Sequence, residues 1–219
     1  SVELKGRFGL VGPSIKLGAR VSSSPALKAN AGVCSPGVKL HGAGFIVTRR
    51  EAASLGLGEN PKISELIHPY LNGRDLNQRP RDALVIDTYP LSEQELRTSA
   101  PSIHQRLLDL VWPERRSNNM KFRRENWWWF GATHKLYRDF VRDMPRYIAT
   151  AETSKHRFFV MLPSTVRADN MLVNFGLDSP HLLAVLSSTL HVSWALATGG
   201  RMGVGNDPRY NKTRCFDPF

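Results

Sequence analysis

The sequence predicts an α+β fold with short mixed or antiparallel strands and several helices. Short apolar runs with strand-like alternation recur along the 219 residues, and segments with helical periodicity and capping signals lie between them. The order shows no regular strand–helix repeat, so a parallel α/β sheet is not indicated. A long apolar segment over residues 180–197 adds one long buried helix near the C-terminus.

Strands are predicted wherever a short apolar run is bounded by glycine, proline or polar residues. Residues 1–22 alternate loosely and are interrupted by glycines, and we interpret them as an N-terminal strand segment that could link this chain to a catalytic domain. Residues 23–219 are predicted to form one domain. The other predicted strands are 38–47, 83–87, 146–152, 156–162 and 170–175.

Capping signals set the starts of the predicted helices. Thr48 and Ser92 each stand three residues before a glutamate, which is the capping-box pattern. Asn60 and Ser179 each precede a proline, which suits the first helical position. Two consecutive glycines after residue 198 end the last helix. The predicted helices are 48–55, 62–67, 103–112, 136–144 and 180–197.

The chain is strongly basic, with a formal net charge of +11 at pH 7. Such a balance favours a polyanionic partner, either nucleic acid or an anionic membrane surface. The apolar run 182–197 is too short and too polar for a membrane span, and no signal peptide is recognised. Cys34 and Cys215 lie far apart in a pattern that indicates neither zinc nor disulfides. We therefore expect a cytoplasmic protein with no membrane partner.

The motifs of common catalytic sites are missing from the sequence. It contains no P-loop, no HExxH, no GxSxG, no PD…(D/E)xK array and no Asn/Asp-Pro-Pro-aromatic segment. We predict no catalytic residue, no metal ligand and no cofactor for this chain itself. The sequence begins without methionine and ends abruptly, so we expect it to be a piece of a larger protein.

Basic side chains gather in segment 113–125, which has five basic and two acidic residues and hence a net charge of +3. Two further arginines fall in the first turn of the helix that begins after Thr48, where the helix dipole disfavours cations unless an anion is bound. We expect these side chains to bind DNA phosphates, with an affinity that falls as salt rises. The phosphate candidates are Arg49, Arg50, Arg115, Arg116, Lys121, Arg123 and Arg124.

The C-terminal segment 198–219 combines glycines with arginine, asparagine and lysine. Glycines allow a close backbone approach to another surface, and these polar side chains hydrogen-bond to base edges. Tyr210 could contact a sugar-phosphate or a thymine methyl, or pack beneath the loop. The candidates for reading bases are Arg201, Asn206, Arg209, Asn211 and Lys212.

An ordered set of segments resembles the DNA target-recognition region of MmeI-like enzymes, which are type IIL restriction–modification proteins similar to stand-alone adenine methyltransferases. The resemblance covers residues 25–219, and HPYLNGRDL at 68–76 is its longest block. The other matching segments are 29–32, 42–46, 51–52, 85–87, 123–128, 186–188, 194, 200–202, 209–210 and 216–219.

The resemblance implies a domain over 23–219 that recognises a short sequence of double-stranded DNA in the major groove. It also implies a partner in the same parent chain, an S-adenosylmethionine-dependent methyltransferase domain, and often an endonuclease domain. S-adenosylmethionine is the cofactor implied for the parent enzyme. Such families vary in the loop at 203–208, so the resemblance does not identify the bases that are read.

Three other functions fit the basic charge. The tryptophans at 127–129 could be stacking platforms for RNA or single-stranded DNA. The chain could instead be a non-catalytic interaction domain whose basic surface counters an acidic partner. A hydrolase with an unrecognised site is the third. Competition between duplex and single strands separates duplex recognition from the first alternative.

Overall fold

Two four-stranded sheets form the centre of the fold, which the computed structural model describes for residues 24–202 and 207–219. The upper sheet has the order β2-β4-β3-β7, with β2 (Ile46–Val47), β4 (Leu84–Ile86), β3 (Ile67–Leu71) and β7 (Arg167–Ala168). The lower sheet has the order β1-β8-β5-β6, with β1 (Cys34–Pro36), β8 (Leu172–Phe175), β5 (Arg146–Ala151) and β6 (Val160–Pro163).

The strands pair antiparallel except at one edge of the upper sheet. There β3 and β7 run parallel, with Tyr70 opposite Arg167. The antiparallel and mixed sheets, together with the helices between them, confirm the predicted α+β class. The expected strand over residues 1–22 lies outside the described residues.

Strand β5 is buried on both faces because it lies between two hydrophobic cores. Tyr147 and Ala149 point into the upper core, and Ile148 points into the lower core with Phe175. Successive side chains of a strand point to opposite faces, so this one apolar strand supplies both cores. The sequence 146–152 predicted the strand correctly.

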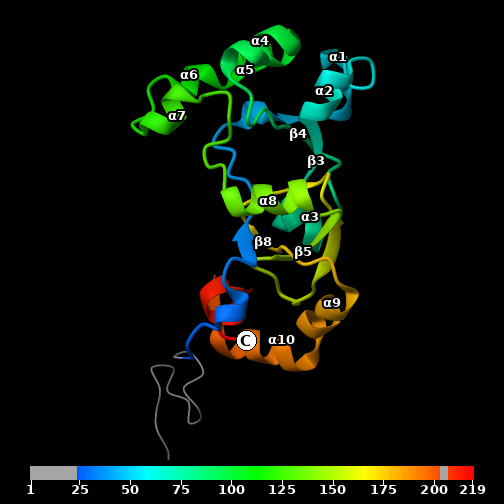
Figure 1. The fold of residues 1–219 in the computed structure, drawn as a ribbon, viewed down its shortest axis with the longest axis vertical. Helices are drawn as coiled ribbons and strands as arrows, with labels where there is room; N and C mark the ends of the chain where they lie inside the picture. The colour runs from blue at the N-terminus through cyan, green and yellow to red at the C-terminus, as the bar shows by residue number, and fades with distance from the viewer. Residues whose placement is uncertain (1–23, 203–206) are drawn as a thin grey trace, which may run out of the picture.

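Most helices lie above the two sheets and form an upper lobe (Figure 1). This lobe contains α1 (Arg49–Leu55), α2 (Pro61–Leu66), α4 (Glu93–Ser99), α5 (Pro101–Leu110), α6 (Trp112–Arg115) and α7 (Lys121–Glu125). Helices α9 (Pro180–Ser187) and α10 (Thr189–Thr198) lie at the opposite end of the molecule (Figure 1).

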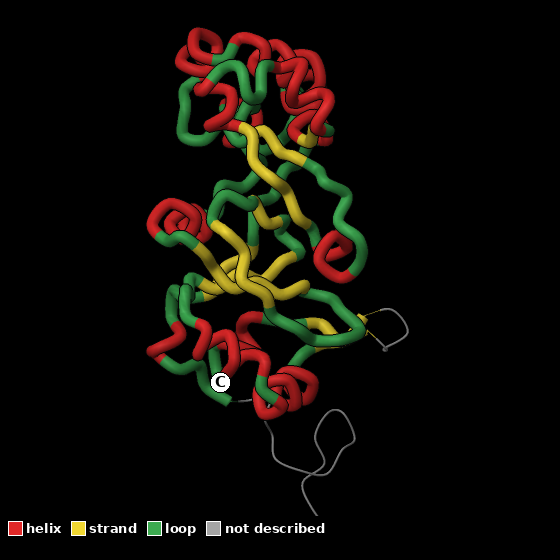
Figure 2. Tube along the Cα trace, turned by 90° about the vertical axis from the view of Figure 1, so that its right-hand side faces the viewer, coloured by secondary structure: helices red, strands yellow, loops and turns green. Residues whose placement is uncertain are grey.

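Two helices cover the upper side of the lower sheet at opposite ends of β5. Helix α8 (Lys135–Asp143) meets the beginning of β5, where the rings of Tyr137 and Tyr147 are 5.7 Å apart. Helix α3 (Gly73–Asn77) meets its end, close to Ala151. Figure 2 shows a helix on each side above the central strands.

The predicted caps are present at three helix starts. The Thr48 hydroxyl accepts a hydrogen bond from the Glu51 backbone N–H at 3.2 Å, and Ser92 does the same for Glu95. Asn60 accepts from the Lys62 N–H at 2.9 Å. A further cap was not predicted from the sequence: Asn72 begins α3 with a capping box.

The expected single buried helix over 180–197 is wrong. Two helices meet there at 54°, because Ser188 adopts an extended conformation and its hydroxyl caps α10 by accepting from the His191 N–H at 3.2 Å. Val185 and Leu190 remain 48% and 73% exposed. Among the described residues no single helix is long and apolar enough to cross a membrane, and the two halves of this bent pair reach that length and composition only together.

The predicted strand 38–47 is also mostly wrong. Val38 forms only an isolated bridge to Asp169, and the segment becomes strand only at β2. Gly44 explains part of the difference, since a Cβ there would lie 2.7 Å from the Cβ of Leu110. The backbone therefore packs directly against α5, and a short 3-10 helix, Ala43–Phe45, replaces the strand.

Candidate nucleic-acid interface

The C-terminal segment forms a β-hairpin at the end of α10. Strand β9 (Gly200–Met202) pairs antiparallel with β10 (Asp207–Arg209), and Arg201 lies opposite Pro208. The hairpin can fold back closely because residue 199 is glycine, whose added Cβ would lie 2.5 Å from the Arg209 carbonyl oxygen. The base-reading candidate Asn206 lies outside the described residues.

Tyr210 anchors the hairpin from below. Its side chain is 1% exposed, its hydroxyl lies 2.8 Å from Nε2 of His191, and its backbone N–H donates to the Glu152 carbonyl at 2.7 Å. Burial raises the pKa of Tyr210 well above its ordinary range. Of the two roles expected for Tyr210, the structure therefore favours packing beneath the loop over contact with DNA.

The remaining candidates of this segment are placed in different surroundings. Arg201 is exposed at the surface. Arg209 forms an ion pair with Glu152 and keeps 42% of its side chain exposed. Lys212 pairs with Asp217 at 3.0 Å. Asn211 accepts the Gly200 N–H through Oδ1 at 3.1 Å, so it holds the hairpin in place.

Arg157 is a structural residue of this site that the sequence reasoning missed. Its guanidinium donates to the Pro208 carbonyl at 3.2 Å and lies over the Tyr210 ring at 5.2 Å from the centroid. Burial lowers the pKa of Arg157 from its ordinary value. The only signal in the sequence was an arginine at the start of an otherwise apolar strand-like run.

The structure does not support the phosphate contact expected at Arg115. Its side chain is 1% exposed and donates to the carbonyl oxygens of Leu40 and His41, both at 2.8 Å. Burial lowers its pKa to about 10. The guanidinium binds the backbone of residues 40–41 and so connects them to α6. Because it is buried there, no phosphate can reach it in this fold.

The other phosphate candidates lie at the surface of the upper lobe. Arg49, Arg50 and Arg116 are exposed, and Lys121 is 78% exposed beside Glu125. The half-buried Arg123 and Arg124 both make internal hydrogen bonds: Arg123 reaches Nε2 of His41 at 2.9 Å, and Arg124 donates to the Asn118 carbonyl at 2.9 Å.

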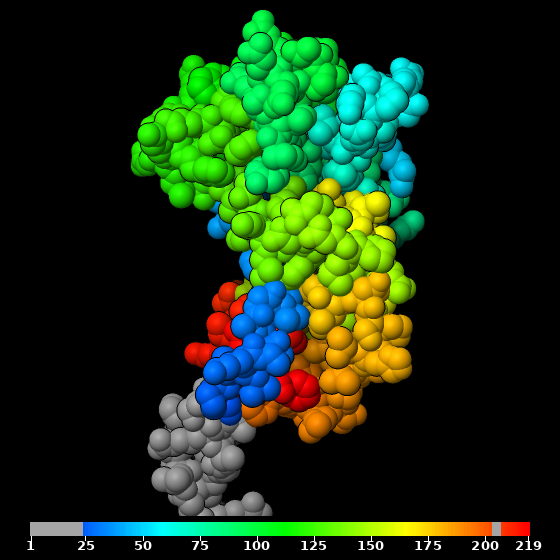
Figure 3. Space-filling model, in the orientation of Figure 1, coloured from blue at the N-terminus to red at the C-terminus, as the bar shows by residue number. Residues whose placement is uncertain are grey.

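The structure does not bring the two sets of candidates together. Figure 3 shows the green α6–α7 segment projecting from the upper lobe, separated by an indentation from the blue and red segments of the lower part. The hairpin belongs to the lower part, since Thr153 at the end of β5 bridges to Arg209.

The tryptophan block is part of the upper core. Trp127 and Trp128 are 4% and 8% exposed. The indole N–H groups of Trp128 and Trp129 each donate to the Leu91 carbonyl at 2.8 Å. Stacked bases would need these rings at the surface, so the block does not favour a single-strand platform.

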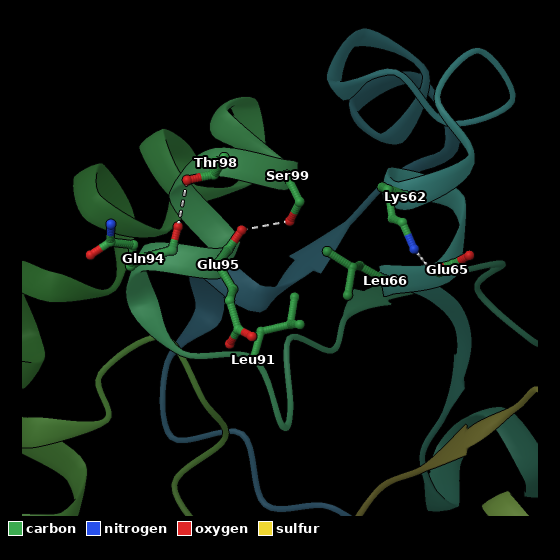
Figure 4. Close-up of a pocket in the computed structure, with 8 residues that line it drawn as sticks. All are labelled: Lys62, Glu65, Leu66, Leu91, Gln94, Glu95, Thr98 and Ser99. Carbon is green, nitrogen blue, oxygen red and sulfur yellow. Dashed lines mark hydrogen bonds and ion pairs between the residues drawn. The ribbon is translucent and has the colours of Figure 1, made fainter.

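A pocket of about 460 Å³ lies between α2 and α4. Figure 4 shows Leu66 and Leu91 facing its interior, with Glu65 and Glu95 among the polar side chains around it. Lys62 pairs with Glu65 at 3.1 Å, so Glu95 leaves the lining with a net negative charge that disfavours an anionic ligand. The described residues include no group of three or more histidine, cysteine or acidic side chains able to hold a metal ion.

Comparison with known proteins identifies the family of this chain. The family described as "MmeI, target recognition domain" matches residues 24–219. No curated protein has a significantly similar sequence. A solved structure of the type IIL restriction-modification enzyme MmeI in complex with DNA shares the fold, with a TM-score of 0.72 and 16% identity. The match covers 94% of this chain and 27% of that one. The chain belongs to the MmeI target recognition domain family.

Proposed function

We propose that this chain is the sequence-recognition module of a restriction–modification methyltransferase and binds double-stranded DNA. The observation that carries the proposal is family membership over residues 24–219. The exposed hairpin supports it, because Tyr210, Asn211 and Arg157 hold the backbone of the hairpin while Arg201 stays at the surface.

Recognition works in two layers. Exposed cations bind phosphates and supply an affinity independent of sequence. The candidates for that layer are Arg49, Arg50, Arg116 and Lys121, with Arg123 and Arg124 after rearrangement of their internal hydrogen bonds. The hairpin supplies the second layer, in which Arg201, Arg209 and Lys212 face base edges.

Guanine suits this second layer, because an arginine can donate two hydrogen bonds to its O6 and N7 atoms. The Glu152 carboxylate holds Arg209 in a fixed orientation, and a base that replaces this ion pair must satisfy the guanidinium equally well. Asn206 is proposed as a further base contact.

The chemistry belongs to the longer protein. We propose that its methyltransferase domain binds S-adenosylmethionine, which supplies the methyl group, and that an endonuclease domain can accompany it. This chain contributes the position of the duplex. Base extrusion and methyl transfer would occur in that domain, in the cytoplasm of a prokaryotic cell.

The test is fluorescence anisotropy of a labelled random-sequence duplex at several salt concentrations. We expect binding that weakens steeply with salt and that single-stranded RNA displaces poorly. No binding at low salt would contradict the proposal, and a preference for the single strand would replace it with the single-strand alternative.

Selection of a preferred sequence then allows a test of Arg201. The Arg201→Ala variant should lose discrimination at one base pair by about 1–3 kcal/mol while keeping its affinity for random duplex. An equal loss on all sequences would assign Arg201 to the phosphate layer instead.

A further inference from the structure

Three segments that are distant in the sequence lie next to the end of strand β5. Ala151 pairs with Leu172, which places the turn before β8 beside it. Thr153 bridges to Arg209 of the hairpin, and Asn77 at the end of α3 donates through Nδ2 to the Thr153 carbonyl at 3.3 Å. Helix α3 and the hairpin are therefore neighbours, joined through one short turn.

The same neighbourhood contains a second hydrogen bond and a surface groove. The Ser154 hydroxyl donates to Oδ1 of Asn77 at 2.8 Å, so both polar atoms of the Asn77 amide are used on the turn. A groove of about 300 Å³ lies along this junction. Its lining includes Asn72, Arg74, Asn77, Thr153, Asp169 and Met171.

Arg74 is the cation of this groove. It precedes Asn77 by three residues, about 4.5 Å along the helix axis, so it stands close to the hairpin. Its side chain is exposed, and Nε donates to the neutral amide oxygen of Gln78 at 3.2 Å. Within the described part of the chain it forms no ion pair, so its guanidinium can accept an anionic partner.

Arg79 adds a positive side chain on the loop that follows α3. The far end of this loop is held in place. Arg81 makes a two-pronged contact with Asp75, with Nε and Nη2 at 2.7 Å and 2.8 Å from the carboxylate oxygens. Asp75 is buried and also caps α3 through the Asn72 N–H. The loop that carries the exposed Arg79 is thus tied to the helix that carries Arg74.

Of the carboxylates close to this surface, two are ion-paired, and Asp169 is hydrogen-bonded to neutral groups that leave its charge in place. Asp169 accepts the Tyr70 hydroxyl at 2.6 Å and the Met171 N–H at 2.9 Å. Asp75 is matched by Arg81, and Glu152 by Arg209. Arg74 therefore lines the groove beside the hairpin, and Arg79 adds a second exposed guanidinium on the loop that follows α3.

We propose that α3 and the loop to Arg81 form a second DNA-backbone-binding element, in which Arg74 and Arg79 pair with phosphates next to the base pairs that face the hairpin. The inference rests on the proposed function and adds a contact surface to it. An exposed guanidinium can donate two parallel hydrogen bonds to phosphate oxygens. These contacts set the register of the duplex and carry no base preference.

The experiment measures duplex affinity against salt for the whole 219-residue chain and its variants. Each of Arg74→Ala and Arg79→Ala should weaken binding to every duplex alike and lower the slope of log K against log salt by about one unit. Arg74→Lys keeps the charge, so it should restore the slope and only part of the affinity.

Arg142→Ala is the matched control. Arg142 is an exposed arginine of α8, which meets the opposite end of β5, and its guanidinium is paired with Asp139 and Asp143. Removing it should leave the slope unchanged. Near-ultraviolet circular dichroism, to which the four tryptophans of the upper core contribute, verifies that each variant is folded.

The outcomes separate the two proposals. A wild-type chain that binds duplex DNA, with Arg74→Ala and Arg79→Ala slopes equal to that of the wild type, overturns the second element and leaves the recognition function standing. A loss confined to one preferred sequence also overturns it, because it assigns these arginines to base reading. A wild-type chain that binds no duplex removes both proposals.

Discussion

At the scale of single residues, burial decides what a basic side chain can do. Arg115 and Arg116 are adjacent, yet Arg115 is 1% exposed and Arg116 is exposed. The first donates to backbone carbonyl oxygens and the second remains available to a polyanion. Net charge therefore predicts the class of partner, while the fold selects which charges can meet it.

This difference predicts opposite results for two neighbouring substitutions. Arg115→Ala leaves buried carbonyl oxygens of Leu40 and His41 without a donor, which should lower the free energy of unfolding by about 3 kcal/mol. Arg116→Ala should change it by less than about 0.5 kcal/mol. Urea unfolding followed by tryptophan fluorescence measures both.

Equal stability of the Arg115→Ala protein and the wild type would mean that water replaces the guanidinium at these carbonyls. A decrease in duplex affinity without any loss of stability would restore Arg115 as a phosphate contact.

The sequence could not show this difference, because the two arginines lie in one basic segment with the same local composition. Similar reasoning applies to Arg138 and Arg167, which lie inside the fold and pair with the buried Asp87. Burial alone would raise the pKa of Asp87, but the two arginines together outweigh it and hold that pKa below its ordinary value. Asp87 directly follows β4, at the end of the strand that the sequence predicted over 83–87.

At the scale of elements, local signals were predictable and tertiary choices were not. The capping boxes at Thr48 and Ser92 depend on residues three positions apart, and both are present. The break at Ser188 depends on which of several polar residues in an apolar run turns its hydroxyl to the backbone. Composition does not distinguish these residues from one another, so the sequence predicted a continuous helix.

The hydrogen bonds between α3 and the β5–β6 connection lead to a second testable prediction. Asn77 uses both ends of its amide on Thr153 and Ser154, and Thr153 bridges to Arg209. Asn77→Ala should loosen the hairpin, so that discrimination between preferred and random duplexes falls several-fold, by about 1 kcal/mol. The salt slope should stay that of the wild type, since no charge is removed.

The measurement is the ratio of the dissociation constants for the two duplexes at one salt concentration. Asn119→Ala, an exposed asparagine of the upper lobe, is the control and should leave the ratio unchanged. A wild-type ratio for Asn77→Ala would show that the hairpin keeps its position without this amide.

At the scale of the whole molecule, two cores are joined through a strand shared between them. The parallel pairing of β3 with β7 joins residues about a hundred positions apart. No local pattern encodes such a pairing, because the two strands are far apart in the sequence. The α+β class was nonetheless predictable, since it needs only the kinds of elements and their order.

Two histidines, the half-buried His68 and the fully buried His191, make stability depend on pH. Burial, and then Arg167, lower the pKa of His68 to about 4; burial, and then Arg157, lower the pKa of His191 to about 4. The ordinary value is about 6.5. Between these values the unfolded chain binds more protons than the folded one, so the stabilisation is complete above about pH 6.5 and is lost as the pH falls toward 4.

The expected result is a melting temperature that falls steadily from about pH 6.5 to pH 4.5, measured by far-ultraviolet circular dichroism. Each buried histidine contributes at most about 1.4 kcal/mol per pH unit in this window. His191→Gln should melt lower at neutral pH, because it disturbs the contact with Tyr210, but its curve should fall less steeply. His181→Gln, with an exposed side chain on α9, should follow the wild-type curve. Parallel curves for His191→Gln and the wild type would show that His191 takes up its proton without unfolding the lower core. In that case the hairpin, which is attached to this core, would remain in place in acid.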